Sequence, residues 1–192
     1  MRLPVSLQSL SDYDQGRVAE ALHLLLEPLG GIAAFVKPGQ KVLIKPNLLA
    51  GKSPEKAVTT HPVIVRLVIR LVQGTGAVVT VGDSPGLGKP ENVARKCGIY
   101  DVVKATGARF ASFEESLPVQ FGSGTFHQLE VSREAIETDV IINLPKLKTH
   151  QMMGYTGAVK NLFGLVVGMR KVCLLYTSDA ADDDTIVWVW VG

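Results

Sequence analysis

Polar and charged side chains follow three apolar runs of the sequence, at the points where those runs end. Lys45-Pro46-Asn47 follows the first run and Gly82-Asp83-Ser84 the second. The third run ends in the segment Asn143-Leu144-Pro145-Lys146-Leu147-Lys148-Thr149-His150. Two lysines and a histidine directly after an apolar run make a concentrated cationic spot, which is typical of a site for an anionic ligand. Lys160 and Asn161 come early in a further predicted helix, where they could reach an anion held by its free N–H groups.

These residue types suggest a division of roles. We expect the lysines to hold an anion, the amides and a serine to orient it, and a carboxylate or a histidine to move protons. The predicted anion-binding residues are Lys45, Asn47, Ser84, Asn143, Lys146, Lys148, Lys160 and Asn161. The predicted proton-transfer residues are Asp83, His61 and His150.

Each of these features also has an ordinary structural explanation. The segment Gly82-Asp83-Ser84-Pro85-Gly86 is a common turn sequence, and its glycines fit neither the P-loop nor the dinucleotide-binding pattern. The lysines and Asp83 could instead form a structural ion-pair network at the edge of a sheet. His61 and His150 could simply lie on the surface. No C-x-x-C or H-E-x-x-H motif is present, so we expect no metal site from these residues.

The three apolar runs, 41–44, 77–81 and 139–144, are short and do not alternate with polar residues, which is typical of strands buried on both faces. Helical patterns separate them, and we expect helices over 14–26, 63–73, 91–97, 100–105 and 156–169. This alternation predicts an α/β fold with a mostly parallel sheet and helices on both faces. A glycine-rich stretch near 119–131 predicts a hairpin on the edge of that sheet.

The composition is that of an ordinary globular chain. The 192 residues are 46% hydrophobic and 20% charged, with a formal net charge of +2, so a disordered, fibrous or coiled-coil chain is excluded. No apolar run is long enough to span a membrane, and Met1 to Ser6 has no signal-peptide character, so we expect a cytoplasmic protein. The basic residues are dispersed, which argues against nucleic acid as a partner. The oligomeric state is not decided.

The last twenty residues differ in composition from the rest. They contain four acidic residues and both tryptophans but no lysine or arginine. The run Cys173 to Asp182 resembles a translated transposon-type sequencing adaptor, whereas the alternative is a genuine valine-rich strand over 186–191. We therefore expect a single domain over 1–171, truncated at its C-terminal end, and a non-native tail over 172–192.

Five segments together resemble the uncharacterised family known as domain of unknown function 362. They are Val36 to Leu49, Thr59 to Pro62, Val81 to Gly86, Ile142 to His150 and Gly157 to Gly164. Several members carry a further ferredoxin-like module with cysteines for 4Fe–4S clusters, and such a module downstream is what the resemblance implies. No ligand set for a cluster is present here, because the sequence has only two cysteines.

Two functions remain open at this stage. The first is a redox-associated enzyme domain, linked to oxidoreductases, that binds a small anionic substrate or cofactor at the carboxyl ends of the strands. The alternative is a non-catalytic module that binds an anionic ligand while a missing partner domain performs the chemistry. Neither the substrate, the reaction nor the identity of any cofactor follows from the sequence.

Overall fold

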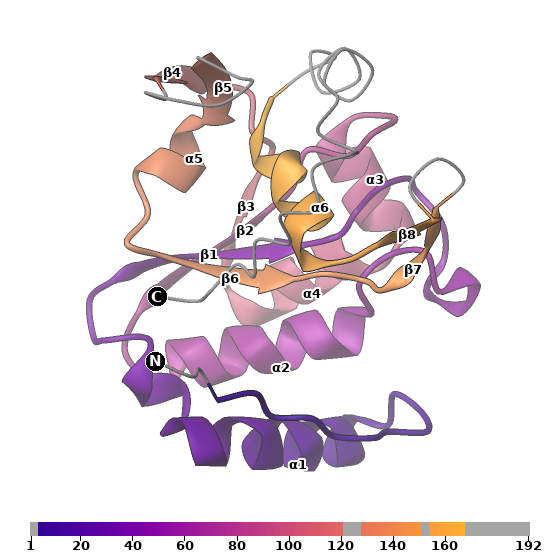
Figure 1. The fold of residues 1–192 in the computed structure, drawn as a ribbon, viewed down its shortest axis with the longest axis vertical. Helices are drawn as coiled ribbons and strands as arrows, with labels where there is room; N and C mark the ends of the chain where they lie inside the picture. The colour runs from indigo at the N-terminus through magenta and orange to yellow at the C-terminus, as the bar shows by residue number, and fades with distance from the viewer. Residues whose placement is uncertain (1–3, 121–127, 151–153, 168–192) are drawn as a thin grey trace.

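Four parallel strands form the central sheet of the protein, as seen in a computed structural model that describes residues 4–120, 128–150 and 154–167, without the His150 side chain (Figure 1). The strands are β1 (Lys41–Pro46), β2 (Val78–Gly82), β3 (Arg109–Ala111) and β6 (Val140–Leu144). Their order is β3-β2-β1-β6, and every neighbouring pair runs parallel. The predicted α/β class with a parallel sheet is confirmed.

One face of the sheet is covered by a thick layer of helices. α2 (Pro62–Gln73), α3 (Pro90–Lys96) and α4 (Ile99–Thr106) pack there, and α1 (Gln15–Leu26) lies outside α2 as a further layer (Figure 1). The inward side chains of the strands alternate, so Val42 and Ile44 of β1 point into this larger core. No helix among the described residues is long and apolar enough to cross a membrane.

The other face has a thinner cover. It is built by α5 (Arg133–Ile136), α6 (Ala158–Leu162) and the 3₁₀ turn η4 (Phe163–Leu165). The second, smaller core cluster on this side contains Leu43, Ala111 and Phe113. Helices therefore lie on both faces, as predicted, but the second face has much less apolar packing.

Two antiparallel pairs stand apart from the main sheet. β4 (Ser116–Gln120) pairs with β5 (Gln128–Ser132), so the hairpin predicted near 119–131 exists, but it forms a two-stranded sheet of its own rather than an edge of the main one. Between β3 and β4 the chain passes through Phe113, which is buried and has a left-handed backbone with φ +52° rather than the extended backbone of a strand. The second pair, β7 (Lys148–His150) and β8 (Gly154–Thr156), was not expected.

The chain beyond β8 also differs from the prediction. The helix expected over 156–169 is only the five residues of α6, followed by η4. The remaining short turns are η1 (Glu27–Leu29), η2 (Ile32–Ala34) and η3 (Pro54–Lys56). The predicted boundary at 171 and the predicted tail over 172–192 lie outside the described residues.

Candidate functional site

The carboxyl ends of β1, β2 and β6 meet at one edge of the sheet. In the strand register Lys45 is the partner of Asn143, and Ile44 is the partner of Val81 just before Gly82 and Asp83. Parallel strands deliver the residues that follow them to the same edge, which is where ligands bind in open α/β sheets. The three polar segments predicted to converge are therefore neighbours.

Lys45 and Asp83 form a buried ion pair at this edge. Lys45 Nζ lies 2.6 Å from Asp83 Oδ1, and the two side chains are 0% and 4% exposed. Asp83 Oδ2 accepts from the Leu48 amide at 2.8 Å, and Lys45 Nζ also donates to the Pro46 carbonyl at 3.2 Å. Burial lowers the pKa of Lys45, and the Asp83 carboxylate opposes that shift. The pair joins β1 to β2 and leaves neither oxygen of Asp83 without a hydrogen-bond donor.

Gly164 covers this ion pair with bare backbone. A Cβ at that position would overlap the Asp83 carboxylate and would lie 2.5 Å from Lys45 Nζ. The Gly164 carbonyl oxygen also accepts from the Ser84 amide at 3.2 Å. A side chain of any size at this position would push η4 off the strand ends, so the close approach requires glycine.

Lys148 reaches the same edge from β7. Its Nζ donates to Asn47 Oδ1 at 2.7 Å and to the Val58 carbonyl oxygen. Burial and the neighbouring Lys146 and Lys160 lower the pKa of Lys148 to about 8, although Asp83 partly offsets them. Among the described residues, the half-buried Lys148 amine is thus held by neutral oxygens rather than by a carboxylate.

A chain of side-chain amides fixes the acceptor for Lys148. Asn47 Nδ2 donates to Asn161 Oδ1 at 2.9 Å, and Asn161 Nδ2 donates to Asn143 Oδ1 at 2.8 Å. Asn143 Nδ2 ends the series on the Ala158 carbonyl at 3.0 Å. Because each amide oxygen accepts from the preceding donor, the orientation of every group in the chain is determined. The network joins the ends of β1 and β6 to α6.

A cleft of about 600 Å³ opens over these groups. Six of the predicted site residues line it, namely Asn47, Asp83, Ser84, Lys148, Lys160 and Asn161. Burial lowers the pKa of Lys160, and no acceptor among the described residues is in hydrogen-bond contact with its ammonium group. Lys45 and Asn143 lie directly behind the lining, in contact with Asp83 and Asn161. α6 has only five residues, so the Lys160 and Asn161 side chains, rather than a helix terminus, form this wall of the cleft.

Besides Lys45 and Asn143, two more predicted residues with described side chains, His61 and Lys146, are not part of the cleft lining. His61 is the N-cap of α2, where its Nδ1 accepts from the Val63 amide at 3.3 Å, and its ring stacks on Tyr13 at 3.7 Å. Lys146 donates to the Tyr13 hydroxyl at 3.1 Å. Burial, followed by the nearby Lys146, lowers the pKa of His61. His150 ends β7, and its side chain lies outside the described residues.

Three features of the site escaped the sequence reasoning. Local helix propensity identifies Gly164 only as a residue that weakens a helix. In the structure its backbone packs directly on the Lys45–Asp83 ion pair, which leaves no room for a Cβ atom. The Thr60 hydroxyl accepts from the Asn47 amide and donates to the Leu144 carbonyl, two contacts that no sequence pattern indicates. The Val58 carbonyl gave no signal, since a backbone acceptor has no sequence pattern.

The residues present do not fit an iron–sulfur cluster. Such clusters are held mainly by four cysteine thiolates, and the sequence has two cysteines. Cys97 is fully buried in the larger core, and burial raises the pKa of its thiol. Within the described part of the chain, no three histidine, cysteine, aspartate or glutamate side chains gather where they could hold a metal ion.

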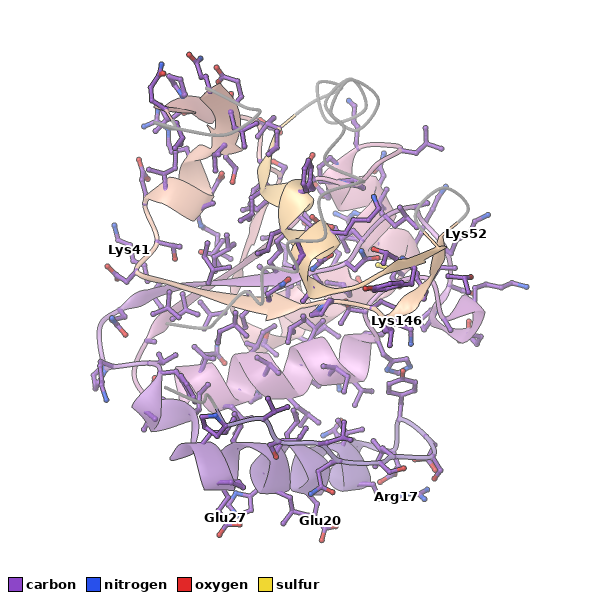
Figure 2. All side chains as sticks on the ribbon, in the orientation of Figure 1. Arg17, Glu20, Glu27, Lys41, Lys52 and Lys146 are labelled. Carbon is purple, nitrogen blue, oxygen red and sulfur yellow. The ribbon has the colours of Figure 1, made fainter. Side chains whose placement is uncertain are left out.

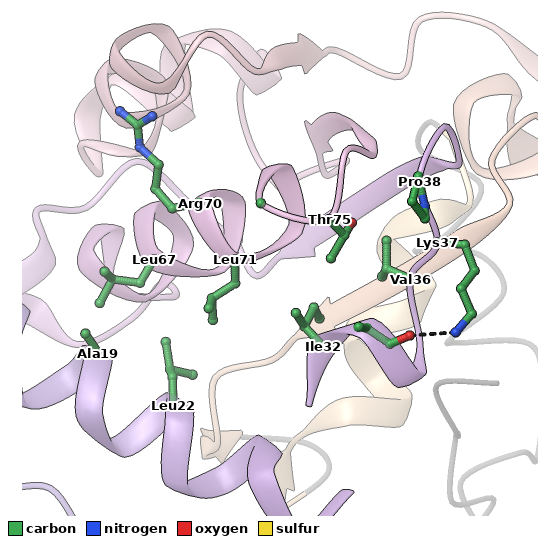
Figure 3. A pocket seen from close by; sticks show the side chains of 12 residues that line it. Ala19, Leu22, Ile32, Val36, Lys37, Pro38, Leu67, Arg70, Leu71 and Thr75 are labelled. Atoms are coloured by element: carbon green, nitrogen blue, oxygen red, sulfur yellow. Dashed lines mark hydrogen bonds between the residues drawn. The ribbon is translucent and has the colours of Figure 1, made fainter. Parts of the chain in front are cut away.

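A second hollow, of about 670 Å³, lies between α1, α2 and η2 (Figure 3). It is lined mainly by aliphatic side chains such as Leu22, Ile32 and Leu71, with Arg70 and Lys37 at its border. The Lys37 ammonium is bound to the Ala33 carbonyl at 2.7 Å. No set of polar groups converges on this hollow, so the cleft at the strand ends is the better candidate for chemistry.

Comparison with known proteins places the chain in a family. It is 42% identical over 167 residues to a thylakoid-associated protein of Synechocystis sp., an alignment that covers 87% of this chain and 52% of that protein. The chain thus spans about half the length of this relative. Residues 42–181 match the family described as domain of unknown function (DUF362), and this stretch contains the strand-end segments and runs past the boundary predicted at 171. With most of its length matched, the chain belongs to the DUF362 family.

Proposed function

We propose that this domain binds a small anionic ligand in the cleft at the carboxyl ends of β1, β2 and β6. The observation that carries the proposal is the pair of half-buried lysines, Lys148 and Lys160, which line one cleft without a carboxylate ion-pair partner among the described residues. Asp83 does not serve as that partner, because its carboxylate is bound to Lys45 and to the Leu48 amide.

The energetic cost of this arrangement supports the proposal. Partial burial lowers the pKa of both lysines, and Lys146 and Lys160 each lower the pKa of Lys148 further. An arrangement of like charges that is unfavourable in the free protein becomes favourable once an anion is bound, and such costs are typical of functional sites. A ligand carrying a phosphate or a carboxylate has the matching charge.

The contacts of Asp83 and His61 support ligand binding in the cleft better than they support proton transfer by these two residues. Asp83 is buried with both oxygens engaged, and the ring of His61 caps a helix outside the cleft. A redox-associated enzyme and a non-catalytic binding module would both use the same cleft, and turnover by a longer protein that includes this domain would separate them. The ferredoxin-like module implied by the family resemblance is a prediction about such a longer protein.

The cytoplasmic location also stays a prediction. The Synechocystis relative is described as thylakoid-associated, and that description belongs to the relative. Cell fractionation of the organism that carries this chain would test both locations.

Thermal unfolding with inorganic phosphate or malate tests the proposed binding. About 10 mM of a bound anion should raise the melting temperature by a few degrees, because a ligand that binds only the folded state stabilises it. The increase should shrink in about 0.5 M NaCl, since added salt screens the lysines. Lys148→Ala and Lys160→Ala should each remove most of the increase.

Lys41→Ala is the matched control. Lys41 is exposed at the start of β1, at the opposite end of the strand from the cleft, and Figure 2 shows it on the far side of the molecule from Lys146. This variant loses the same charge but should keep the full anion-induced increase. An increase that is equal in all three variants, or absent from the unmodified protein, would refute the proposed function.

A further inference from the structure

Two acceptors hold the Lys148 amine and leave one position on its nitrogen open. Its Nζ donates to Asn47 Oδ1 and to the Val58 carbonyl oxygen. A neutral primary amine has two N–H groups and one lone pair, so these two acceptors use all of its hydrogen atoms. Within the described residues no third acceptor is in hydrogen-bond contact with this nitrogen. The remaining position on the nitrogen is therefore available for a ligand in the cleft.

Burial of Lys148 favours the neutral amine. It is the largest cause that lowers the pKa of Lys148 from 10.5 to about 8. Asp83, the strongest of the neighbouring charges, raises this pKa, whereas Lys146 and Lys160 each lower it. Near neutral pH this shift gives on the order of a hundredfold more free amine than an ordinary lysine has.

Lys160 supplies a second point of attachment for a ligand. It lines the same cleft as Lys148, and its ammonium has no hydrogen-bond acceptor among the described residues. One end of a small ligand can therefore carry the negative charge that Lys160 binds, while another atom of the ligand meets the Lys148 amine.

We propose that Lys148 is a nucleophile that condenses with the carbonyl group of a small anionic aldehyde or ketone bound in the cleft. This inference rests on the proposed anion binding and names its substrate class. The lone pair of Nζ attacks the carbonyl carbon and forms a C–N bond. Both amine protons pass to the carbonyl oxygen, which leaves as water, and a C=N bond remains. The step needs no oxidant or reductant.

Trapping with sodium cyanoborohydride tests this step, because the reagent reduces the C=N bond to a stable secondary amine. Three probes separate the chemical requirements: pyridoxal 5′-phosphate carries a phosphate and an aldehyde, glyoxylate a carboxylate and an aldehyde, and pyridoxal an aldehyde without an anionic group. Near pH 8, peptide mass spectrometry should show that the anionic probes label Lys148 about tenfold or more faster than Lys41 of the same chain. The faster of the two anionic probes identifies the preferred anion.

Two variants control the experiment. Lys160→Ala should slow the labelling of Lys148 by the anionic probes much more than its labelling by pyridoxal. Loss of the Lys160 charge raises the pKa of Lys148 for every probe, but it removes the contact with the anion only for the two anionic ones. Lys148→Arg should abolish the fast labelling but keep the phosphate-induced rise in melting temperature, since arginine retains the positive charge without forming the imine. The labelling rate at Lys148 should also rise with pH through about 8, the pKa that its burial and the charges of Asp83, Lys146 and Lys160 give it.

Failure of this inference and failure of the proposed function give different results. Phosphate stabilisation together with labelling of Lys148 no faster than that of Lys41 would overturn the nucleophile and leave anion binding intact. Fast labelling of Lys148 by all three probes alike, without stabilisation by phosphate or malate, would overturn anion binding and the ligand class while showing a reactive amine.

Discussion

The Lys45 ammonium lies 2.6 Å from the Asp83 carboxylate, although the two residues are 38 positions apart in the chain. Lys45 is the second-to-last residue of β1, and Asp83 directly follows β2. Both side chains lie beneath Gly164, in the interior of the sheet edge. Asp83 therefore lines the candidate site with Lys45 buried directly behind it, while Lys148 and Lys160 are the lysines of the lining.

Replacing one member of the Lys45–Asp83 pair should lower the free energy of unfolding more than replacing both members together. Asp83→Asn leaves the Lys45 ammonium buried without a counter-charge and should lower the free energy of unfolding by about 3–5 kcal/mol. Lys45→Met leaves the carboxylate unpaired and should cost a similar amount. The double variant should be more stable than either single one, because no charge is then buried and the asparagine oxygen can still accept from the Leu48 amide. Urea unfolding measures all three, and additive losses would show that the pair is not coupled.

Gly164→Ala should destabilise the protein by about 3 kcal/mol, the upper end of the range for overpacking. The added methyl group would overlap Asp83 and crowd Lys45 Nζ, so η4 must shift or the ion pair must separate. Gly16→Ala is the control, because the nearest atom to a Cβ there is Asp14 Oδ1 at an ordinary 3.4 Å, and alanine in α1 should gain up to about 1 kcal/mol. Equal melting temperatures for the two variants would contradict the close approach at Gly164.

Stability should rise with pH above about 8, partly through Lys148. Its pKa is about 8 in the folded protein against 10.5 for the free side chain, so the unfolded chain binds more protons between these two values. The free energy of unfolding therefore increases with pH across this window. Lys45 and Lys160 contribute in the same direction, since their pKa values are also lowered.

Lys148→Met should reduce the increase of the free energy of unfolding with pH. Below pH 8 the variant also removes the unfavourable charge of the half-buried Lys148 ammonium. Urea unfolding at several pH values from about 7 to 10 measures the slope. Lys41→Met serves as the control and should follow the unmodified protein. A slope that is identical in Lys148→Met would show that the Lys148 amine does not titrate in this window.

His61→Ala should cost stability without affecting anion binding. It removes the acceptor for the Val63 amide and the stacking partner of Tyr13, which should lower the free energy of unfolding by about 1–2 kcal/mol. His61→Asn keeps a capping oxygen and should recover part of the loss. Loss of the phosphate-induced rise in melting temperature in a stable His61→Asn protein would instead place His61 in the binding site.

The strands and their order of appearance were predictable from local pattern. β1 and β6 contain the apolar runs 42–44 and 140–142 and end at or beside a proline, Pro46 or Pro145. β2 ends at Gly82, so the type and position of these strands both followed from the residues. The hairpin of β7 and β8 was missed because its residues are neither apolar nor alternating. The helix predicted after it was too long within the described residues, because α6 ends at Leu162 and the η4 turn that contains Gly164 follows.

The amino-acid sequence by itself determined that lysines, asparagines and Asp83 would gather at one edge of a parallel sheet, since parallel strands all end on the same side. Only the tertiary structure decided which of these residues form a buried ion pair and which face the cleft. Lys45 shares a strand face with Leu43, and that face is covered by η4, so its ammonium is buried and binds Asp83. Lys148 lies on the separate strand β7, and its hydrogen-bond acceptors among the described residues are neutral oxygens. Two lysines that look alike in sequence thus differ because burial and the available partner, not residue type, set the role of a charge.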